Sequence, residues 1–475
     1  MMHHRNTKII FTIGPATDTP EMLRALIREG VDICRINMAH APREDLAGIV
    51  SRVREAGKDE GRDIAIMVDI KGPEIRTGEV SEPLQLKAGD LLDLACSEDA
   101  DEQPDVPLVQ VNYPGLINDL KEGSSILVDN GLLRFKVLKK TESRLQCEVE
   151  IGGKMGSRRH INLPGTHVSL PALTKKDYLD IEFSVAAGVD FFAQSFVREP
   201  EDVESFRRVL SEKGSSARII AKIEDQQAIS NLDDIIRASD GLMVARGDLG
   251  IECPYEDLPV IQKRAVTTCI RLRKPAIVAT HMLESMIENP VPTRAEVSDI
   301  TYAVAERTDA IMLSGETTVG KFPLDCVRVF KRIAETTEKL DNVATRVPLD
   351  LRNPKSKLVR SAARLAEDVD NASVIVFTRA GNLPQTVSSL RPVGTPIFAF
   401  TDQPHLVPQM RLIRGVHPFL IDFAEDGETT IQSAFRLLTE HGYVAVGSWA
   451  VLITTVLRRK RLVDGLQLRQ VDPQE

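Results

Sequence analysis

Short runs rich in Val and Ile recur along the chain, separated by longer segments in which apolar residues return every three or four positions. Strands that are buried on both faces appear as near-continuous apolar runs, as in parallel sheets. Eight such runs are present: Ile9–Ile13, Ile33–Asn37, Ile64–Ile70, Phe191–Phe196, Ile219–Ile223, Gly241–Ala245, Ala276–Thr280 and Ala310–Ser314. The helical segments between them include Pro20–Glu29, Arg43–Lys58, Pro200–Glu212, Gln226–Ser239 and Tyr255–Arg273. Eight strand–helix units in series predict an α/β fold built on a (β/α)8 TIM barrel.

The alternation breaks once, after the third run. Between Ile70 and about Val168 the runs are short and separated by turn residues: Leu91–Cys96, Ile126–Val128, Leu132–Val137 and Leu145–Ile151. Asn130-Gly131 lies between two of them and is a strong hairpin signal. We interpret this part as a small β-barrel domain inserted into the TIM barrel, where it would act as a lid.

The chain changes character again after the eighth run. A helix near Leu324–Leu340 is followed by a polar link at Asn353-Pro354. Three further apolar runs, Val374–Phe377, Ile397–Phe400 and Tyr443–Val446, alternate with helical segments. We therefore expect the first part of the barrel at 1–71, the inserted domain at 72–168, the second part of the barrel at 169–345 and a C-terminal α/β domain at 346–475.

Composition narrows the class of protein. The 475 residues are 42% apolar and 27% charged, as in ordinary globular proteins, with a net charge of -9 and only 4% aromatic residues. This balance argues against a nucleic-acid or membrane surface. The six cysteines form no CxxC pair, and the chain has neither a secretory leader pattern nor a run of 18 apolar residues. We expect a cytoplasmic protein.

Polar residues stand at nearly every predicted strand end. They are Arg35, Asn37, His40, Asp69, Lys71, Ser195, Lys222, Glu224, Arg246, Gly247, Asp248, Thr280, Ser314 and Glu316. The carboxyl ends of TIM-barrel strands meet on one face, which is where active sites form. One or two buried polar groups would fit a structural pair, whereas acids and bases at so many strand ends predict a converging site.

The types of side chain indicate a reaction class. Glu224 and Asp248 follow neighbouring strands and offer the hard oxygen ligands that Mg²⁺ or Mn²⁺ prefers. Arg35, Arg76 and Lys222 offer cations for phosphate. The N–H groups near Gly247 would open a helix, which is a natural anion site. A metal and several cations around phosphate indicate phosphoryl transfer.

Several longer motifs follow one another along the chain. They are Thr7-Lys8 to Ala16, Arg35-Ile-Asn37-Met-Ala-His40, Asp69-Ile-Lys71 to Gly78, Asn162-Leu-Pro-Gly165, Ala221-Lys222-Ile-Glu224, Val244 to Gly250, Thr280 to Met286, Pro292 to Asp299 and Met312 to Thr317. In this order they resemble the motifs of pyruvate kinases. The resemblance covers nearly the whole chain. It implies transfer of the phosphoryl group of phosphoenolpyruvate to ADP, which gives pyruvate and ATP.

The resemblance also assigns roles by position. Arg35, Lys222 and Thr280 would be catalytic: the first two bind the transferred phosphate, and Thr280, with Ser314 near it, belongs to the route that protonates the enolate. Ser195, Gly247, Asp248 and Thr280 would help to hold phosphoenolpyruvate. Glu224 and Asp248 would ligate Mg²⁺ or Mn²⁺. His40, Arg76 and Arg159 would face the nucleotide.

Some positions depart from the family pattern. Asn37, Asp69 and the Ile70 carbonyl match ligands of K⁺, but Ala39 stands where a Ser hydroxyl is usual. Because Glu74 is the acidic type found in K⁺-dependent members, we expect K⁺ still to activate, with a water in the gap.

The effector loop of the C-terminal domain departs as well. Thr378, Arg379 and Gly381 remain, while two hydroxyl positions are lost, which favours a sugar monophosphate or AMP over fructose 1,6-bisphosphate. The resemblance further implies a homotetramer. Two alternatives stay open: another barrel enzyme that uses phosphoenolpyruvate, and a catalytically silent sensor of phosphorylated metabolites.

Overall fold

A closed parallel barrel forms the centre of the protein. The computed structural model describes residues 5–96, 106–340, 347–349, 351, 353–458 and 461–472. All eight runs predicted as barrel strands are strands of this barrel, in the order β1-β16-β15-β14-β13-β12-β3-β2. Their bounds are β1 Lys8–Thr12, β2 Ile33–Asn37, β3 Ala65–Ile70, β12 Phe191–Gln194, β13 Arg218–Ile223, β14 Gly241–Ala245, β15 Ala276–Ala279 and β16 Ala310–Met312. The predicted (β/α)8 architecture is confirmed.

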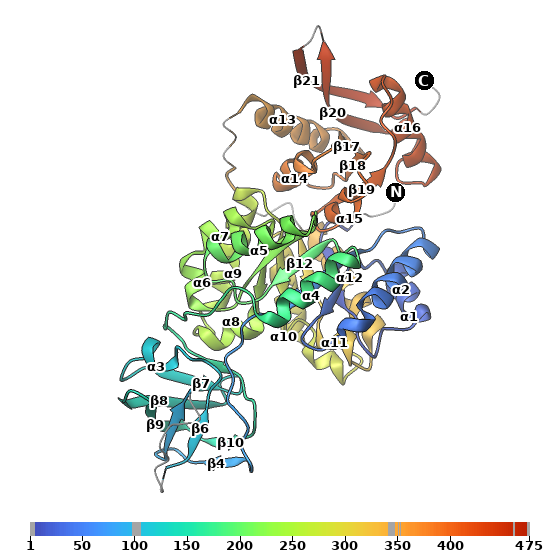
Figure 1. Cartoon of the computed structure of the whole chain (residues 1–475). Coiled ribbons are helices and arrows are strands. Elements are labelled where there is room, and N and C mark those ends of the chain that lie inside the picture. Colours follow the sequence, from blue (N-terminus) through green and yellow to red (C-terminus); the bar gives the residue numbers. More distant parts are fainter. Residues whose placement is uncertain are drawn as a thin grey trace.

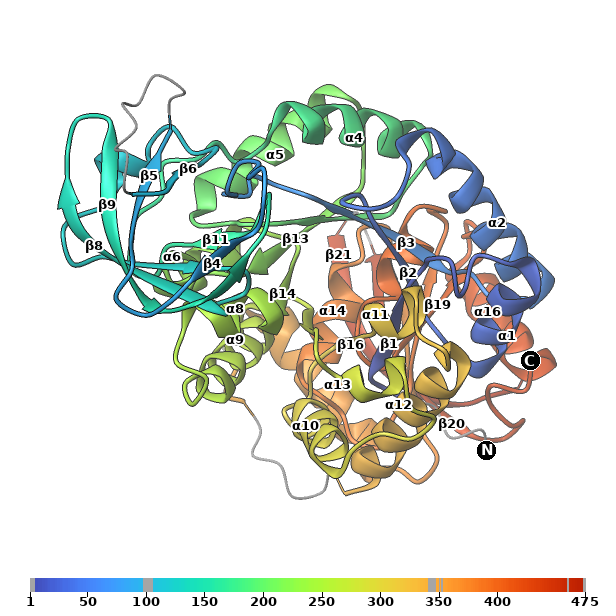
Figure 2. The same cartoon turned by 90° about the horizontal axis from the view of Figure 1, so that it is seen from below.

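Helices surround the strands, as Figure 2 shows. They are α1 Pro20–Glu29, α2 Leu46–Asp59, α4 Lys175–Ala186, α5 Pro200–Glu212, α6 Gln226–Ser230, α7 Leu232–Ala238, α8 Arg246–Glu252, α9 Leu258–Leu272, α10 Arg294–Ala305, α11 Gly315–Thr318 and α12 Pro323–Lys339, with 3-10 turns at Arg43–Asp45 and Glu284–Ile287. The segment predicted as one helix over Gln226–Ser239 is divided at Asn231, whose backbone is not helical.

The barrel interior is filled by side chains. Ile10, Ile33, Met67 and Phe191 are among its fully buried residues. Leu412, from the C-terminal domain, belongs to the same cluster and is also fully buried. The interior is therefore a packed core that is sealed at one end, so the active site is restricted to the other end.

The inserted segment is β-rich, as predicted. Its elements are β4 Leu84–Leu86, β5 Leu91–Ala95, β6 Leu108–Gln110, α3 Leu116–Asp119, β7 Ser125–Val128, β8 Leu133–Lys140, β9 Arg144–Ile151, β10 Gly153–Met155 and β11 Ile161–Asn162. They form a six-stranded sheet and a two-stranded sheet. The β7–β8 hairpin turns at Asn130-Gly131, where both residues have positive φ, as the sequence predicted.

The C-terminal part is a five-stranded α/β domain in the order β19-β18-β17-β20-β21. Its elements are α13 Pro354–Asp368, β17 Ser373–Phe377, α14 Asn382–Ser389, β18 Ile397–Thr401, α15 Leu406–Met410, β19 Val416–Leu420, α16 Gly427–Glu440, β20 Trp449–Arg458 and β21 Arg461–Gln470. The prediction of a strand at Tyr443–Val446 is wrong: these residues are turns between Gly442 and Gly447, which have positive φ. The expected domain boundary at 345/346 lies outside the described residues.

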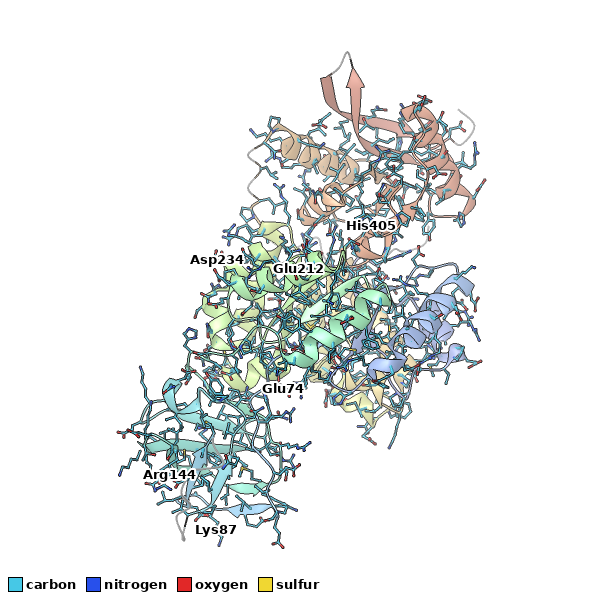
Figure 3. All side chains as sticks on the ribbon, viewed as in Figure 1. Glu74, Lys87, Arg144, Glu212, Asp234 and His405 are labelled. Carbon is cyan, nitrogen blue, oxygen red and sulfur yellow. The ribbon has the colours of Figure 1, made fainter. Side chains whose placement is uncertain are left out.

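The two additional domains lie at opposite ends of the barrel (Figure 1). Contacts of the C-terminal domain involve residues at the beginnings of barrel strands: Lys8 donates to the Val416 carbonyl at 2.7 Å, and Arg391 pairs with Asp309 at 2.7 Å. In Figure 3, Glu74 marks the junction with the inserted domain and His405 marks the junction with the C-terminal domain. The strand ends with polar residues are therefore at the side of the inserted domain. Across the described ranges, no helix combines the length and apolar character needed to span a membrane.

Candidate active site

Lys222 is the centre of a buried polar network at the carboxyl ends of the strands. Its Nζ lies 2.7 Å from Ser195 Oγ, 2.8 Å from Glu224 Oε1 and 3.2 Å from Asp69 Oδ1. Burial alone would lower the pKa of Lys222, but the Asp69 and Glu224 carboxylates outweigh it and raise that pKa above the ordinary value. The amine therefore remains charged at neutral pH, and its Nζ lies among the polar groups at the carboxyl ends of the strands.

Arg35 joins the network from β2. Its guanidinium contacts Asp69 Oδ2 at 2.6 Å and donates to Thr12 Oγ1 at 3.0 Å. Burial raises the pKa of Asp69, but Lys222 and Arg35 more than offset this and hold it below its usual range. Two cations thus share the Asp69 carboxylate, which is only 2% exposed, and are held side by side at the strand ends. Such an arrangement can bind an incoming phosphate.

Glu224 directly follows β13, and Asp248 lies in the first turn of α8, which follows β14; both provide negative charge. The Phe196 N–H donates to Glu224 Oε2 at 2.7 Å, which fixes the carboxylate. Burial and the neighbouring Asp248 raise the pKa of Glu224 to about 7, against the opposing effect of Lys222. Two acids close enough to repel one another form a donor set that a divalent cation would stabilise.

Thr280 and Gly247 meet beside these acids. The Gly247 N–H donates to Thr280 Oγ1 at 2.6 Å, and the Thr280 hydroxyl donates to the Ala279 carbonyl at 2.7 Å. Thr280 has a φ of 68° and His281 a φ of 54°, a left-handed conformation that costs a non-glycine residue about 1–3 kcal/mol. Ser314 Oγ is a buried hydroxyl without a partner among the described residues. The structure thus brings the predicted phosphate, metal and hydroxyl groups together on one face.

The predicted nucleotide residues lie around the edge of this face. Arg76 donates to Glu74 at 2.6 Å and to the Arg158 carbonyl at 2.8 Å. Arg159 is exposed on the inserted domain, 3.3 Å from Asp129. His40 is exposed on the loop after β2. Arg76 and Arg159 lie on neighbouring segments, since the Thr77 N–H donates to the Arg159 carbonyl at 2.8 Å. That these two residues and His40 form one nucleotide subsite stays a prediction.

The predicted K⁺ residues are neighbours in the barrel. Asn37 and Asp69 are register partners on β2 and β3. Asn37 Oδ1 accepts from the Ala39 N–H at 3.1 Å, and the Ile70 carbonyl accepts from Ser195 at 2.8 Å. Oxygens of this kind are hard ligands. Asn37 Oδ1 and the Ile70 carbonyl each accept one hydrogen bond, whereas the Asp69 carboxylate is engaged by Arg35, Lys222 and Ser195.

The predicted effector residues lie at the opposite end of the barrel. Thr378 Oγ1 accepts from the Gly381 N–H at 2.9 Å, and Gly381 has a φ of 77° before α14. Arg379 donates to Asp402 at 2.6 Å and stacks over the Phe423 ring at 5.2 Å.

Sequence reasoning missed two residues beside the active site, His160 and Glu252. His160, which belongs to none of the predicted strand ends, is half-buried next to Phe196, and burial lowers its pKa while Asp248 and Glu74 oppose that effect. It lines a cavity of about 460 Å³ between the inserted domain and the barrel, together with Glu224 and Glu252. Neither residue follows a barrel strand directly, so the strand-end criterion had no means of finding them.

A TIM barrel whose active-site face combines two clustered cations with two adjacent acids defines a phosphotransferase-type site. Comparisons with known proteins narrow this class. The family model described as "Pyruvate kinase, barrel domain" matches residues 4–327, and "Pyruvate kinase, alpha/beta domain" matches residues 356–462.

Individual proteins agree with the family models. Plastidial pyruvate kinase 2 of Arabidopsis thaliana is 39% identical over 98% of this chain and 81% of its own length. A pyruvate kinase of Clostridium acetobutylicum is 36% identical over 95% of this chain and 96% of its own length. The crystal structure of a pyruvate kinase from Cryptosporidium parvum superposes with a TM-score of 0.90 at 34% identity, covering 98% and 96% of the two chains. The chain belongs to the pyruvate kinase family and is a phosphotransferase.

Proposed function

We propose that this face of the barrel carries out the reaction of the family, the transfer of the phosphoryl group of phosphoenolpyruvate to ADP, giving pyruvate and ATP in the final step of glycolysis. The observation that carries the proposal is the position of Lys222, between Asp69, Ser195 and Glu224 and beside Arg35. Lys222 and Arg35 bind the transferred phosphate, and Lys222 neutralises the enolate oxygen as the bond to phosphorus breaks. Ser195, Gly247 and Thr280 hold the rest of phosphoenolpyruvate.

The divalent metal fits the acids that are present. Glu224 and Asp248 offer carboxylate oxygens, and no cluster of three or more His, Cys, Asp or Glu side chains suited to a metal occurs in the described part of the chain. Two protein ligands leave positions for substrate oxygens and water, which is the coordination that Mg²⁺ favours and Mn²⁺ accepts. The ion supplies charge stabilisation to the transferring phosphoryl group. Arg76, His40 and Arg159 bind the nucleotide.

K⁺ is the second proposed ion. Asn37, Asp69 and the Ile70 carbonyl supply oxygen ligands, and water replaces the hydroxyl that Ala39 lacks. Glu74 is held by Lys71 at 3.1 Å and by Arg76 at 2.6 Å, which lower the pKa of its carboxyl group and keep it ionised. Replacing K⁺ by a cation that does not bind should reduce turnover, and unchanged turnover would exclude the site.

The reaction itself is tested by product analysis. Purified protein with phosphoenolpyruvate, ADP, Mg²⁺ and K⁺ should form pyruvate and ATP in equal amounts, and nothing when ADP is omitted. Consumption of phosphoenolpyruvate without ADP would instead indicate another barrel enzyme that uses this substrate. Binding of phosphoenolpyruvate without any product, in the presence of candidate effectors, would indicate a silent sensor.

Regulation is proposed at the other end of the barrel. A cavity of about 710 Å³ between the barrel and the C-terminal domain is lined by cations: Arg207, Arg218, Arg273, Lys274 and Arg379. This charge suits a phosphorylated effector, and we propose a sugar monophosphate or AMP bound by Thr378, Arg379 and Gly381. Ribose 5-phosphate or AMP should shift phosphoenolpyruvate saturation to lower concentration, and Arg379→Ala should abolish the shift. Arg364→Ala, an exposed Arg of α13 outside this cavity, is the matched control.

Assembly and location complete the proposal. Large apolar side chains are exposed near α9 and α10, including Val260 at 68% and Tyr302 at 40%, as expected for a surface that another subunit covers. We propose a cytoplasmic homotetramer. Light scattering should then give about four times the chain mass of 52.5 kDa.

A further inference from the structure

Two consecutive residues at the end of β15 are held in a strained backbone conformation. Thr280 and His281 have φ values of 68° and 54°, although neither is a glycine. For a β-branched residue such as Thr this is a genuine outlier, and it persists only where the surroundings enforce it. The groups that hold this conformation come from the beginning of α8.

Arg246 is bonded to this segment from the beginning of α8. Its Nη2 donates to the Thr280 carbonyl at 2.9 Å, and its Nε lies 3.4 Å from the Ala279 carbonyl. The outer edge of the guanidinium pairs with Asp299 on α10 at 2.7 Å. Arg246 is only 7% exposed. Because the guanidinium is planar and presents its donors in fixed directions, it fixes two successive carbonyls relative to α10.

The residue after Arg246 fixes the other end of the same threonine. The Gly247 N–H donates to Thr280 Oγ1 at 2.6 Å, while the hydroxyl hydrogen is directed to the Ala279 carbonyl. The side chain of Arg246 and the main chain of Gly247 therefore hold the carbonyl and the hydroxyl of Thr280 together. The bonds from Arg246 and Gly247 fix the backbone and the Oγ1 atom of Thr280, and only the hydroxyl hydrogen can rotate, by leaving the Ala279 carbonyl.

We propose that Arg246 is a positioning residue for the protonation of the enolate, acting through Thr280. This inference rests on the proposed role of Thr280 in that step. In the reaction the bond between phosphorus and the C2 oxygen breaks, and a bond from phosphorus to ADP forms. The enolate of pyruvate then takes one proton at C3, supplied by solvent through the Thr280 hydroxyl, and becomes the methyl group of pyruvate. Arg246 does not touch substrate; it sets where that hydroxyl lies.

The test separates the two steps in a single turnover. Enzyme in excess over phosphoenolpyruvate is mixed with ADP and Mg²⁺ and quenched at intervals, and ATP and pyruvate are measured separately. In wild type the two products should appear together. Arg246→Lys keeps the charge but cannot hold both carbonyls, and a displacement of about 1 Å costs roughly 100-fold. In this variant we expect the rate of pyruvate formation to be about 10- to 100-fold lower than the rate of ATP formation, which should itself change much less.

A matched control distinguishes positioning from stability. Arg391 is likewise buried, bonded to a main-chain carbonyl and paired with an acid, Asp309, but at the opposite end of the barrel. Arg391→Lys should lower thermal stability and leave pyruvate and ATP synchronous. If Arg246→Lys does not fold, Asp299→Asn loosens only the outer end of the guanidinium and should give a lag of about 3- to 10-fold.

Thr280→Val separates failure of this inference from failure of the proposed role of Thr280. A lag in Thr280→Val together with synchronous products in Arg246→Lys would overturn the positioning role of Arg246. Synchronous products in Thr280→Val would instead overturn the role of Thr280 itself. A lag of equal size in Arg391→Lys would also overturn the inference, because any loosening of the barrel would then be sufficient.

Discussion

Replacing Lys222 by Met should separate the stability of the barrel from its chemistry. The substitution removes a cation that lies 2.8 Å from Glu224 and 3.2 Å from Asp69, two carboxylates that are each 2% exposed. Asp69 keeps Arg35, so one buried carboxylate is left without its cation. Breaking a buried pair in this way costs about 3–5 kcal/mol. At roughly 2–4 °C per kcal/mol for a domain of this size, Tm should fall by about 6–20 °C.

The loss of activity should be much larger than this destabilisation explains. In the proposed reaction Lys222 contributes its charge where negative charge develops, and removal of one such group costs about 100- to 1,000-fold in kcat. Pyruvate formation is measured with lactate dehydrogenase and NADH, at a temperature at which thermal unfolding shows that the variant is folded. Turnover within 10-fold of wild type, equivalent to about 1.4 kcal/mol, would refute the role of Lys222.

Lys8 provides a matched control for this experiment. It is also a fully buried lysine of a barrel strand, but at the sealed end, where its Nζ donates to the Val416 carbonyl at 2.7 Å. Burial lowers the pKa of Lys8 to about 8. Lys8→Met should change Tm and leave kcat within about 3-fold, since the site lies at the other end of the strands. Equal losses in both variants would mean that the activity reports barrel integrity only.

Three further predictions concern other parts of the molecule. Burial raises the pKa of Glu252 from 4.5 to about 7, so the folded state holds more protons than the unfolded state between these values and stability falls as pH rises through that window. Glu252→Gln should reduce the difference between the free energies of unfolding at pH 5 and pH 8, measured with urea, by up to about 3 kcal/mol. An unchanged difference would contradict the raised pKa of Glu252. Ala39→Ser should lower the half-activating K⁺ concentration about 3- to 10-fold in steady-state assays. Leu412→Ala should cost about 2–5 kcal/mol in thermal unfolding without changing kcat, because this side chain seals the far end of the barrel.

The barrel was predictable because its strands are buried on both faces. Such strands give local, continuous apolar runs, and the closed parallel arrangement then brings the residues that follow them to one face. Arg35, Lys222 and Glu224 were identified in this way before any distance was known. The turn at Asn130-Gly131 was predictable for the same local reason, since positive φ restricts the choice of residue.

Other features depend on contacts that have no local pattern. The prediction of a strand at Tyr443–Val446 followed an apolar run, but Tyr443 and Val444 pack on the core of the C-terminal domain from a turn and Val446 is exposed. Arg246 was visible only as one more charge at a strand end. The Arg246 side chain holds two main-chain carbonyls because of the direction in which it points. Main-chain acceptors are the same for every residue type, so the sequence cannot indicate such contacts. His160 was missed because its neighbours come from the barrel, 36 residues away in the case of Phe196.

The two ends of the barrel are joined by very short pieces of chain, and this restricts how an effector could act. Arg218, in the basic cavity, and Lys222, in the active site, are both on β13, four residues apart, or about 13 Å in an extended strand. Yet β13 is hydrogen-bonded to β12 on one side and to β14 on the other. It cannot slide by itself without breaking both ladders. A ligand near Arg218 would therefore have to act by moving the C-terminal domain and barrel as bodies, which changes subunit contacts, rather than by shifting this strand. In the proposed homotetramer such a movement would reach the loops after the strands, where Thr280 and the inserted domain are attached, while the barrel core itself stays unchanged.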